Sequence, residues 1–187
     1  MFLQAVIIPP RDVVDAVAHA VASAMPAPGS GLEPAAAEHL NLPIAALGNV
    51  TMGDAIRVAA TLKAAAADWS APTIRFAGAT VHEFPRSQAV VLTMDGEVDE
   101  LISIARAATQ SLQRRGFHFD RRKFVPMLSV ATIPDTANCT QVRACLDQLE
   151  GFRGQAWTVD HVSLAKRSFG TTSGEASEFQ PILLGAH

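Results

Sequence analysis

The sequence contains no tyrosine, and aromatic residues occupy only 6% of its 187 positions. It has only two cysteines, Cys139 and Cys145, and they do not form a Cys-x-x-Cys pair. This spacing argues against a thiolate metal site or a disulfide within one helix, so we expect both side chains to be buried as small hydrophobic groups. No apolar run reaches the roughly 18 residues that a membrane helix requires, and the first residues lack the pattern of a signal peptide. We therefore expect a cytoplasmic protein without a membrane partner.

Hydrophobic residues, by contrast, are abundant at 49% of the chain, whereas charged residues make up 18%. Such a composition can bury enough apolar surface to offset the entropy lost on folding, which excludes a wholly disordered chain. The 15 basic and 18 acidic residues leave a formal net charge of −3. A protein that wraps nucleic acid through its phosphates needs a broad basic surface. We expect no extended nucleic-acid surface, although a local phosphate pocket is compatible with this charge.

The hydrophobic period alternates along the chain between two, which is typical of strands, and about 3.6, which is typical of helices. A period of two predicts strands near residues 2–8, 39–48, 72–84, 88–94, 124–131, 155–165 and 179–184. A helical period predicts helices around residues 13–21, 53–69, 98–112 and 142–149. The strand at 72–84 contains Gly78, which predicts a bend.

The order of these elements repeats, because each half of the chain starts with β-α-β-α-β and places its second strand at a similar offset from its first. We therefore predict a bilobed, duplicated α+β fold with two antiparallel-rich sheets, flanking helices and a central cleft. The chain is expected to form one domain over residues 1–187, with lobes at about 1–85 and 86–187. The strands near His39 and Met127 hold equivalent places, so they should face each other across the cleft, where ligands usually bind.

Four segments carry a more specific signal: the opening "MFLQAVIIPP", then "EHLNLPIAALGNV", "RRKFVPMLSVAT" and "WTVDHVSLAKRS". In order and spacing they resemble the two-histidine (2H) phosphoesterase superfamily, in particular the 2'-5' RNA ligase and RNA 2',3'-cyclic phosphodiesterase-like proteins. The resemblance implies two His-x-Thr/Ser motifs that face a cyclic phosphate, with the histidines exchanging protons and the hydroxyls binding phosphate oxygens. It implies no cofactor, and the spacing of histidines and carboxylates indicates no metal site.

The sequence departs from the pattern of the family in both motifs. The first keeps His39 but has Asn41 at the hydroxyl position, where an amide can still donate to phosphate. In the second, Pro126 is followed by Met127, Leu128 and Ser129, so methionine stands where the resemblance implies a histidine. We thus interpret His39 as the remaining catalytic group, Asn41, Met127 and Ser129 as substrate-binding residues, and the protein as a degenerate phosphoesterase or pseudoenzyme.

Other residues could replace the missing histidine. His161 and Ser163 form a His-x-Ser pair, and His118 precedes the second motif within a basic run. That run comprises Arg114, Arg115, Arg121, Arg122 and Lys123. Its positive charge is compatible with a solvated turn or with a rim that attracts phosphate.

Three functions follow from these residues. The first is a protein that binds a small phosphate-bearing nucleotide or an RNA terminus with weak or no phosphodiesterase activity. The second is an active 2',3'-cyclic phosphodiesterase, a hydrolase in which another group replaces the second histidine. The third is a non-catalytic structural or interaction protein.

Overall fold

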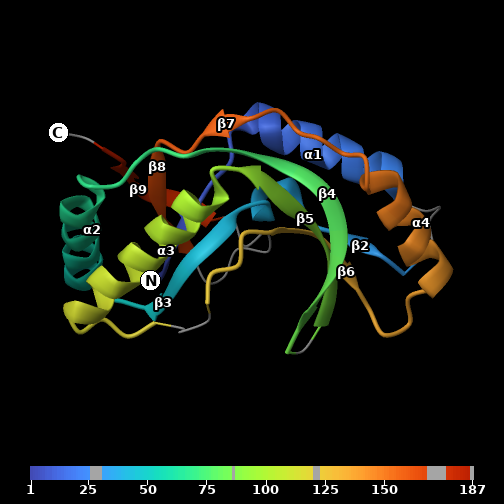
Figure 1. The fold of residues 1–187 in the computed structure, drawn as a ribbon. Coiled ribbons are helices and arrows are strands. Elements are labelled where there is room, and N and C mark those ends of the chain that lie inside the picture. Colours follow the sequence, from blue (N-terminus) through green and yellow to red (C-terminus); the bar gives the residue numbers. More distant parts are fainter. Residues whose placement is uncertain (26–30, 86, 120–122, 168–175, 186–187) are drawn as a thin grey trace.

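Two antiparallel sheets organise the structure, a computed structural model that describes residues 1–25, 31–85, 87–119, 123–167 and 176–185 (Figure 1). The first sheet contains, in spatial order, β3 (Leu42–Asn49), β1 (Phe2–Ile7), β8 (His161–Arg167) and β9 (Ala176–Leu183). The second contains β2 (Glu33–Pro34), β6 (Leu128–Ile133), β5 (Ser87–Gly96), β4 (Thr73–Phe84) and β7 (Trp157–Thr158). The predicted α+β class with two antiparallel sheets is confirmed.

Helices cover the outer sides of both sheets. They are α1 (Arg11–Ala24), α2 (Met52–Ala66), α3 (Val98–Arg114) and α4 (Cys139–Leu149). Helices α2 and α3 contact each other and pack on β9 and β3 of the first sheet, whereas α1 contacts α4, which packs on β4 of the second. Within the described part of the chain, no helix is both long and apolar enough to cross a membrane.

The sheets do not follow the predicted division at residue 86. Strand β1 hydrogen-bonds β3 along one edge and β8 along the other, so the first sheet joins the two ends of the sequence. The second sheet takes β2 and β4 from the first half and β5, β6 and β7 from the second. The reason is that β1 is largely buried and both of its edges need backbone partners, which strands from distant parts of the sequence supply. Periodicity along one strand carries no information about its neighbours.

Two predicted strands begin later than the sequence suggested. His39 lies in a short 3₁₀ turn, Ala37–His39, in which its amide donates to the carbonyl of Ala36 at 2.8 Å, and β3 starts only at Leu42. The segment from Phe124 to Met127 is likewise irregular, and β6 starts at Leu128, after a proline that cannot donate to a ladder. The predicted alternation of buried and exposed side chains nevertheless holds through the first segment, since Leu40, Leu42 and Ile44 are all buried.

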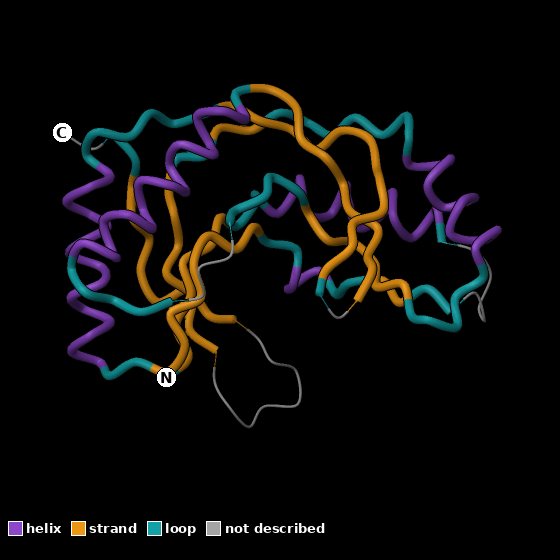
Figure 2. Tube along the Cα trace, turned by 60° about the horizontal axis from the view of Figure 1, so that its bottom comes forward, coloured by secondary structure: helices purple, strands orange, loops and turns teal. Residues whose placement is uncertain are grey.

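The long hairpin of β4 and β5 forms an arch that runs from beside α3 toward α4 (Figures 1 and 2). As predicted, it bends at Gly78, whose φ of 68° lies in the left-handed region, and the pairing register shifts between Phe76 and Ala79. The bend directs the hairpin tip, where β4 ends at Phe84, toward the concave side of the structure. A residue distant in sequence from both motifs thereby reaches the space between the sheets.

The N-terminus of α2 provides a direct test of local stability. The Thr51 hydroxyl accepts a hydrogen bond from the amide of Asp54 at 3.1 Å and so caps the helix. Replacing it with alanine (Thr51→Ala) should lower the free energy of unfolding by about 1 kcal/mol, measured by urea denaturation. Thr61→Ala is the matched control, because the Thr61 hydroxyl donates to the Arg57 carbonyl within the same helix. A control loss as large as that of Thr51→Ala would contradict a capping role.

The two cysteines differ in environment, which corrects the expectation that both are buried: Cys139 is exposed and Cys145 is buried. Cys139 is the first residue of α4, whereas Cys145 lies within the helix and packs into the core. Burial raises the pKa of the Cys145 thiol, so fewer molecules carry the reactive thiolate there at a given pH.

We expect a thiol reagent such as dithionitrobenzoate to label one cysteine rapidly in the native protein and both in denaturant. Cys139→Ser should abolish the rapid phase; two rapid native phases would contradict this assignment.

Candidate ligand-binding cleft

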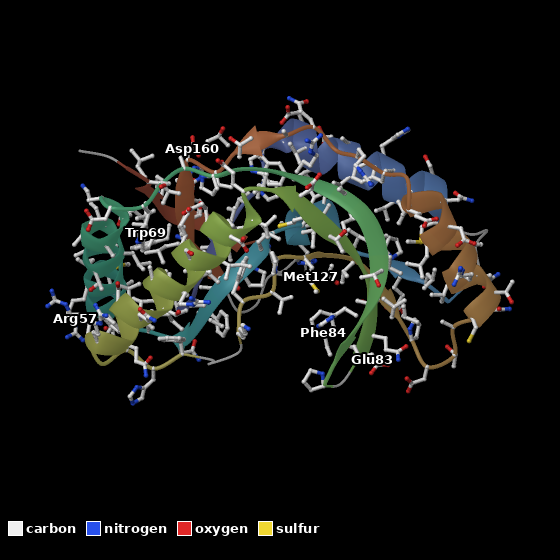
Figure 3. The ribbon with its side chains drawn as sticks, in the orientation of Figure 1. Arg57, Trp69, Glu83, Phe84, Met127 and Asp160 are labelled. Carbon is white, nitrogen blue, oxygen red and sulfur yellow. The ribbon has the colours of Figure 1, made fainter. Side chains whose placement is uncertain are left out.

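A cleft of about 420 Å³ lies between the first sheet and the segment that leads into β6. Its walls come from the turn before β3, from β3 itself, from the hairpin tip and from residues 123–129. The lining residues are His39, Asn41, Pro43, Ile44, Ala46, Phe84, Lys123, Phe124, Val125, Met127 and Ser129. Figure 3 shows Met127 and Phe84 together on the concave side of the molecule.

The first motif enters the cleft from the 3₁₀ turn. His39 is exposed, and Asn41 is half-buried two residues further on. The Asn41 backbone amide donates to the His39 carbonyl at 2.9 Å, and its side-chain amide approaches the same oxygen at 3.4 Å. These contacts keep the two residues in one compact turn, and Leu40 between them is buried in the core. The imidazole and the amide thus belong to the same wall of the cleft.

The second motif forms the facing wall. Leu128 is 1% exposed and packs into the core, while its neighbours Met127 and Ser129 line the cleft. This is the alternation expected where a strand begins, because successive side chains point to opposite faces. Ser129 lies opposite Val91 of β5, so the central strand of the second sheet supports its position. The structure therefore places His39, Asn41, Met127 and Ser129 along one cleft.

Several lining residues were not singled out as site residues from the sequence. Phe84 arrives from the hairpin tip, and Phe124 and Val125 from the irregular segment before β6. A partly exposed phenylalanine next to a hairpin turn is a weak sequence signal, and only the bend at Gly78 directs it inward. Lys123 belongs to the basic run noted above and reaches the cleft, whereas Arg121 and Arg122 lie outside the described residues.

The sequence and the structure were compared with those of known proteins. No protein-family model matches the sequence, and no curated protein does. Solved structures do match: E. coli LigT complexed with 3'-AMP superposes with a TM-score of 0.72 at 18% identity, over 99% of this chain and 98% of that one. TT0787 of Thermus thermophilus gives 0.71 at 16% identity, and a structure described as a phosphoesterase gives 0.70 at 21%, both with the same coverage. The chain therefore has the α+β fold of LigT. The expected fold is thus confirmed by structures over the whole chain.

Other E. coli LigT structures with this fold are complexed with NADP+, phosphate or ATP. They match the present chain at 19–20% identity over 99% of its length. Similarity at this level establishes the LigT-like fold and leaves the chemistry to be argued from the residues of this chain.

The two accessory histidines proposed from the sequence lie elsewhere in the LigT-like fold. His161, on β8, lines a separate cavity with Pro9 and Pro10. Its Nδ1 lies 2.5 Å from Asp160 Oδ1 and its Nε2 3.7 Å from Glu178 Oε1, so both ring nitrogens face carboxylates. His118 is exposed beyond the end of α3 and does not line the cleft. Among the described residues, neither histidine lines the cleft with His39.

Ser163, the second residue of the His-x-Ser pair, is fully buried and donates its hydroxyl to Glu178 Oε1 at 2.6 Å. A buried hydroxyl engaged with a carboxylate is unavailable to a phosphate in solution. The His-x-Ser pair is therefore explained by packing and hydrogen bonding within the first sheet.

The cleft combines one imidazole, one amide, one hydroxyl and one ammonium with an apolar wall. The imidazole can donate or accept a hydrogen bond through its ring nitrogens, and the other three groups can donate hydrogen bonds. A lysine ammonium adds positive charge, which favours an anion. The apolar lining residues, among them Ile44, Phe84 and Met127, offer a surface for a nucleobase or sugar. The arrangement suits recognition of a small molecule with one phosphate end and one flat, less polar end.

Proposed function

We propose that the cleft binds a small phosphate-bearing nucleotide or RNA terminus and turns it over weakly or not at all. The observation that carries this proposal is the convergence of the two motif segments on one cleft, with phosphate donors on both walls. Asn41 and Ser129 donate to phosphate oxygens, His39 contacts the phosphate or the attacking water, and Lys123 supplies charge at the rim. The nucleoside packs on the apolar side chains.

The relatives in fold support a ligand of this class. E. coli LigT has been crystallised with 3'-AMP, NADP+, phosphate and ATP, all of which carry phosphate. Its likeness to this chain extends over both sheets, since 99% of the chain is covered. The proposal assigns the same class of ligand to the cleft of this chain on the basis of its own four polar groups.

Weak turnover follows from the chemistry of the two walls. Opening a 2',3'-cyclic phosphate requires one group to deprotonate water and another to protonate the leaving oxygen. Among the described lining residues His39 is the one imidazole, and the facing position is Met127, whose thioether can do neither. A positioned acid or base contributes about 10²–10⁴-fold to rate, so loss of one partner leaves recognition largely intact and catalysis impaired.

Ligand binding can be tested by calorimetric titration with 3'-AMP. Hydrogen bonds to charged groups contribute about 1.5–3 kcal/mol, so His39→Ala and Asn41→Ala should each weaken binding by about 10- to 100-fold. His19→Ala is the matched control, since this histidine is exposed on α1 outside the cleft and its loss should change affinity less than about twofold. Affinity unchanged by both cleft substitutions would place the ligand elsewhere and contradict the proposal.

Catalytic impairment can be tested by restoring the missing group. Met127→His should raise hydrolysis of a nucleoside 2',3'-cyclic phosphate by about 10²-fold or more over the wild type. Val125→His is the control, because it places an imidazole in the same cleft outside the motif position. His39→Ala in the Met127→His background should remove the gain. A wild type that already hydrolyses the substrate rapidly, with no effect of Met127→His, would show that another group completes the acid–base pair.

A further inference from the structure

His161 lies between two carboxylates at the start of β8. Its Nδ1 is 2.5 Å from Asp160 Oδ1, and its Nε2 is 3.7 Å from Glu178 Oε1. The His161 side chain is 30% exposed, so the ring is held partly inside the protein and still reaches solvent. Asp160 lies well apart from Met127 (Figure 3), and the cavity that His161 lines shares no described lining residue with the cleft. This cluster is therefore separate from the proposed nucleotide site.

The pairing of β8 with β9 brings Glu178 to His161, although the two residues are distant in sequence. Successive side chains of a strand alternate between its faces, so His161 and Ser163 point to the same face of β8. Glu178 lies opposite Ala165 in the neighbouring strand, and its Oε1 accepts a hydrogen bond of 2.6 Å from the Ser163 hydroxyl. This bond holds the carboxylate along β8, where it approaches the imidazole. The spacing of residues in the sequence indicated no metal site because it contains no signal for this pairing.

The two ring nitrogens of His161 differ in their bonding. An ionised carboxylate only accepts hydrogen bonds, so Nδ1 carries the proton that Asp160 binds, and the neutral imidazole keeps its lone pair on Nε2. The 3.7 Å from Nε2 to Glu178 Oε1 is longer than the roughly 2.7–3.2 Å of an N–H···O hydrogen bond. Nε2 and Oε1 are thus two electron-pair donors that face each other. A cation between them stabilises such a pair.

A transition-metal ion fits between these two atoms. Zinc lies about 2.0–2.1 Å from an imidazole nitrogen and about 2.0–2.2 Å from a carboxylate oxygen. These two lengths add up to slightly more than the 3.7 Å between Nε2 and Oε1, so one ion can bind both atoms at a bent angle, as tetrahedral coordination requires. An imidazole ligand favours zinc, copper, iron or nickel, whereas magnesium and calcium take oxygen ligands. The ligand types therefore indicate an ion of the zinc class.

The residues behind the two ligands resemble the outer shell of a metal site. A histidine that binds a metal usually donates its other ring N–H to a carboxylate, which here is Asp160. A carboxylate that binds a metal is usually hydrogen-bonded as well, and here the donor is Ser163, which is fully buried. Both ligands are thereby fixed in orientation before any ion arrives.

The protein supplies two ligands, since the described residues contain no group of three His, Cys, Asp or Glu side chains that could hold a metal. Zinc usually takes four ligands, so two positions remain for water or for an anionic group. A cavity of about 330 Å³, lined by His161 and Glu178, provides the space for them. Ile8, Pro10 and Trp157 form part of its apolar wall.

We propose that His161 Nε2 and Glu178 Oε1 bind a divalent transition-metal ion of the zinc class, with water in the open positions. Asp160 and Ser163 are positioning residues, which hold the two ligands and do not contact the ion. The ion links β8 to β9 outside the cleft, so this inference does not depend on the function proposed for the cleft.

Calorimetric titration of the full chain with Zn²⁺ tests this site. All proteins carry Cys139→Ser, because an exposed thiol is itself a zinc ligand. His161→Ala and Glu178→Gln should each weaken Zn²⁺ binding by about 100-fold or more, and Asp160→Asn by about tenfold, since loss of an outer-shell partner typically costs about 10- to 100-fold. In Glu178→Gln the amide oxygen can still accept from Ser163, so the contact between the strands is kept. An excess of Mg²⁺ should not displace Zn²⁺.

His82→Ala and Glu83→Gln, in the same background, are the matched controls. They remove a neighbouring histidine and carboxylate from the hairpin, where His82 packs edge-on against Phe84 and Glu83 accepts a hydrogen bond from Gln88. Neither change should alter the affinity for Zn²⁺ by more than about twofold. Thermal melting checks that every variant folds.

Nitrogen NMR of the imidazole of His161 gives a second readout. Zn²⁺ should shift the resonance of Nε2 and leave Nδ1 protonated. Absence of Zn²⁺ binding, or equal affinity with and without His161→Ala, would overturn the proposal; the second result would show an adventitious ion only. Two protonated ring nitrogens in excess Zn²⁺ would also overturn it, because a proton then takes the place of the metal. None of these outcomes bears on the binding of 3'-AMP in the cleft.

Discussion

The pairing of β1 with strands on both of its edges is the interaction on which the rest of the structure depends. Because β3 and β8 both hydrogen-bond this strand, the first sheet unites residues from the beginning and the end of the chain. The intervening residues are left to form most of the second sheet. Backbone groups buried at the centre of the first sheet are satisfied in this way, and the two sheets are held at a separation that leaves a cleft between them.

The cleft is lined largely by side chains from irregular segments that lie next to regular strands. His39 lies three residues before β3 and Met127 lies directly before β6, both in segments outside the sheet ladders. Strands β3 and β6 fix where these segments start, so side chains outside the ladders are placed by a rigid support. The hairpin of β4 and β5 bends at Gly78, and its tip brings Phe84 to the cleft. Polar and apolar groups from three separate parts of the chain meet there.

Substitution of a single motif residue has different consequences for recognition and for catalysis. Phosphate can be bound by any suitable set of donors, and the cleft offers an amide, a hydroxyl and an ammonium besides the His39 imidazole. Proton transfer needs two titratable groups on opposite sides of the reacting phosphate. Under the proposed function, the Met127 thioether contributes apolar contact and cannot carry a proton.

The sequence by itself determined the elements, the α+β class and the two motif segments, because periodicity, prolines and glycines act locally. It also predicted which side chains of the motifs leave the core, since Leu40 and Leu128 mark the buried positions between them. Only the tertiary structure decided that the sheets combine both halves of the chain, that His161 faces carboxylates away from the cleft, and that Phe84 lines the cleft. Strand partners, cavity walls and side-chain neighbours arise from contacts between residues far apart in the chain. A single sequence carries no local signal for such contacts.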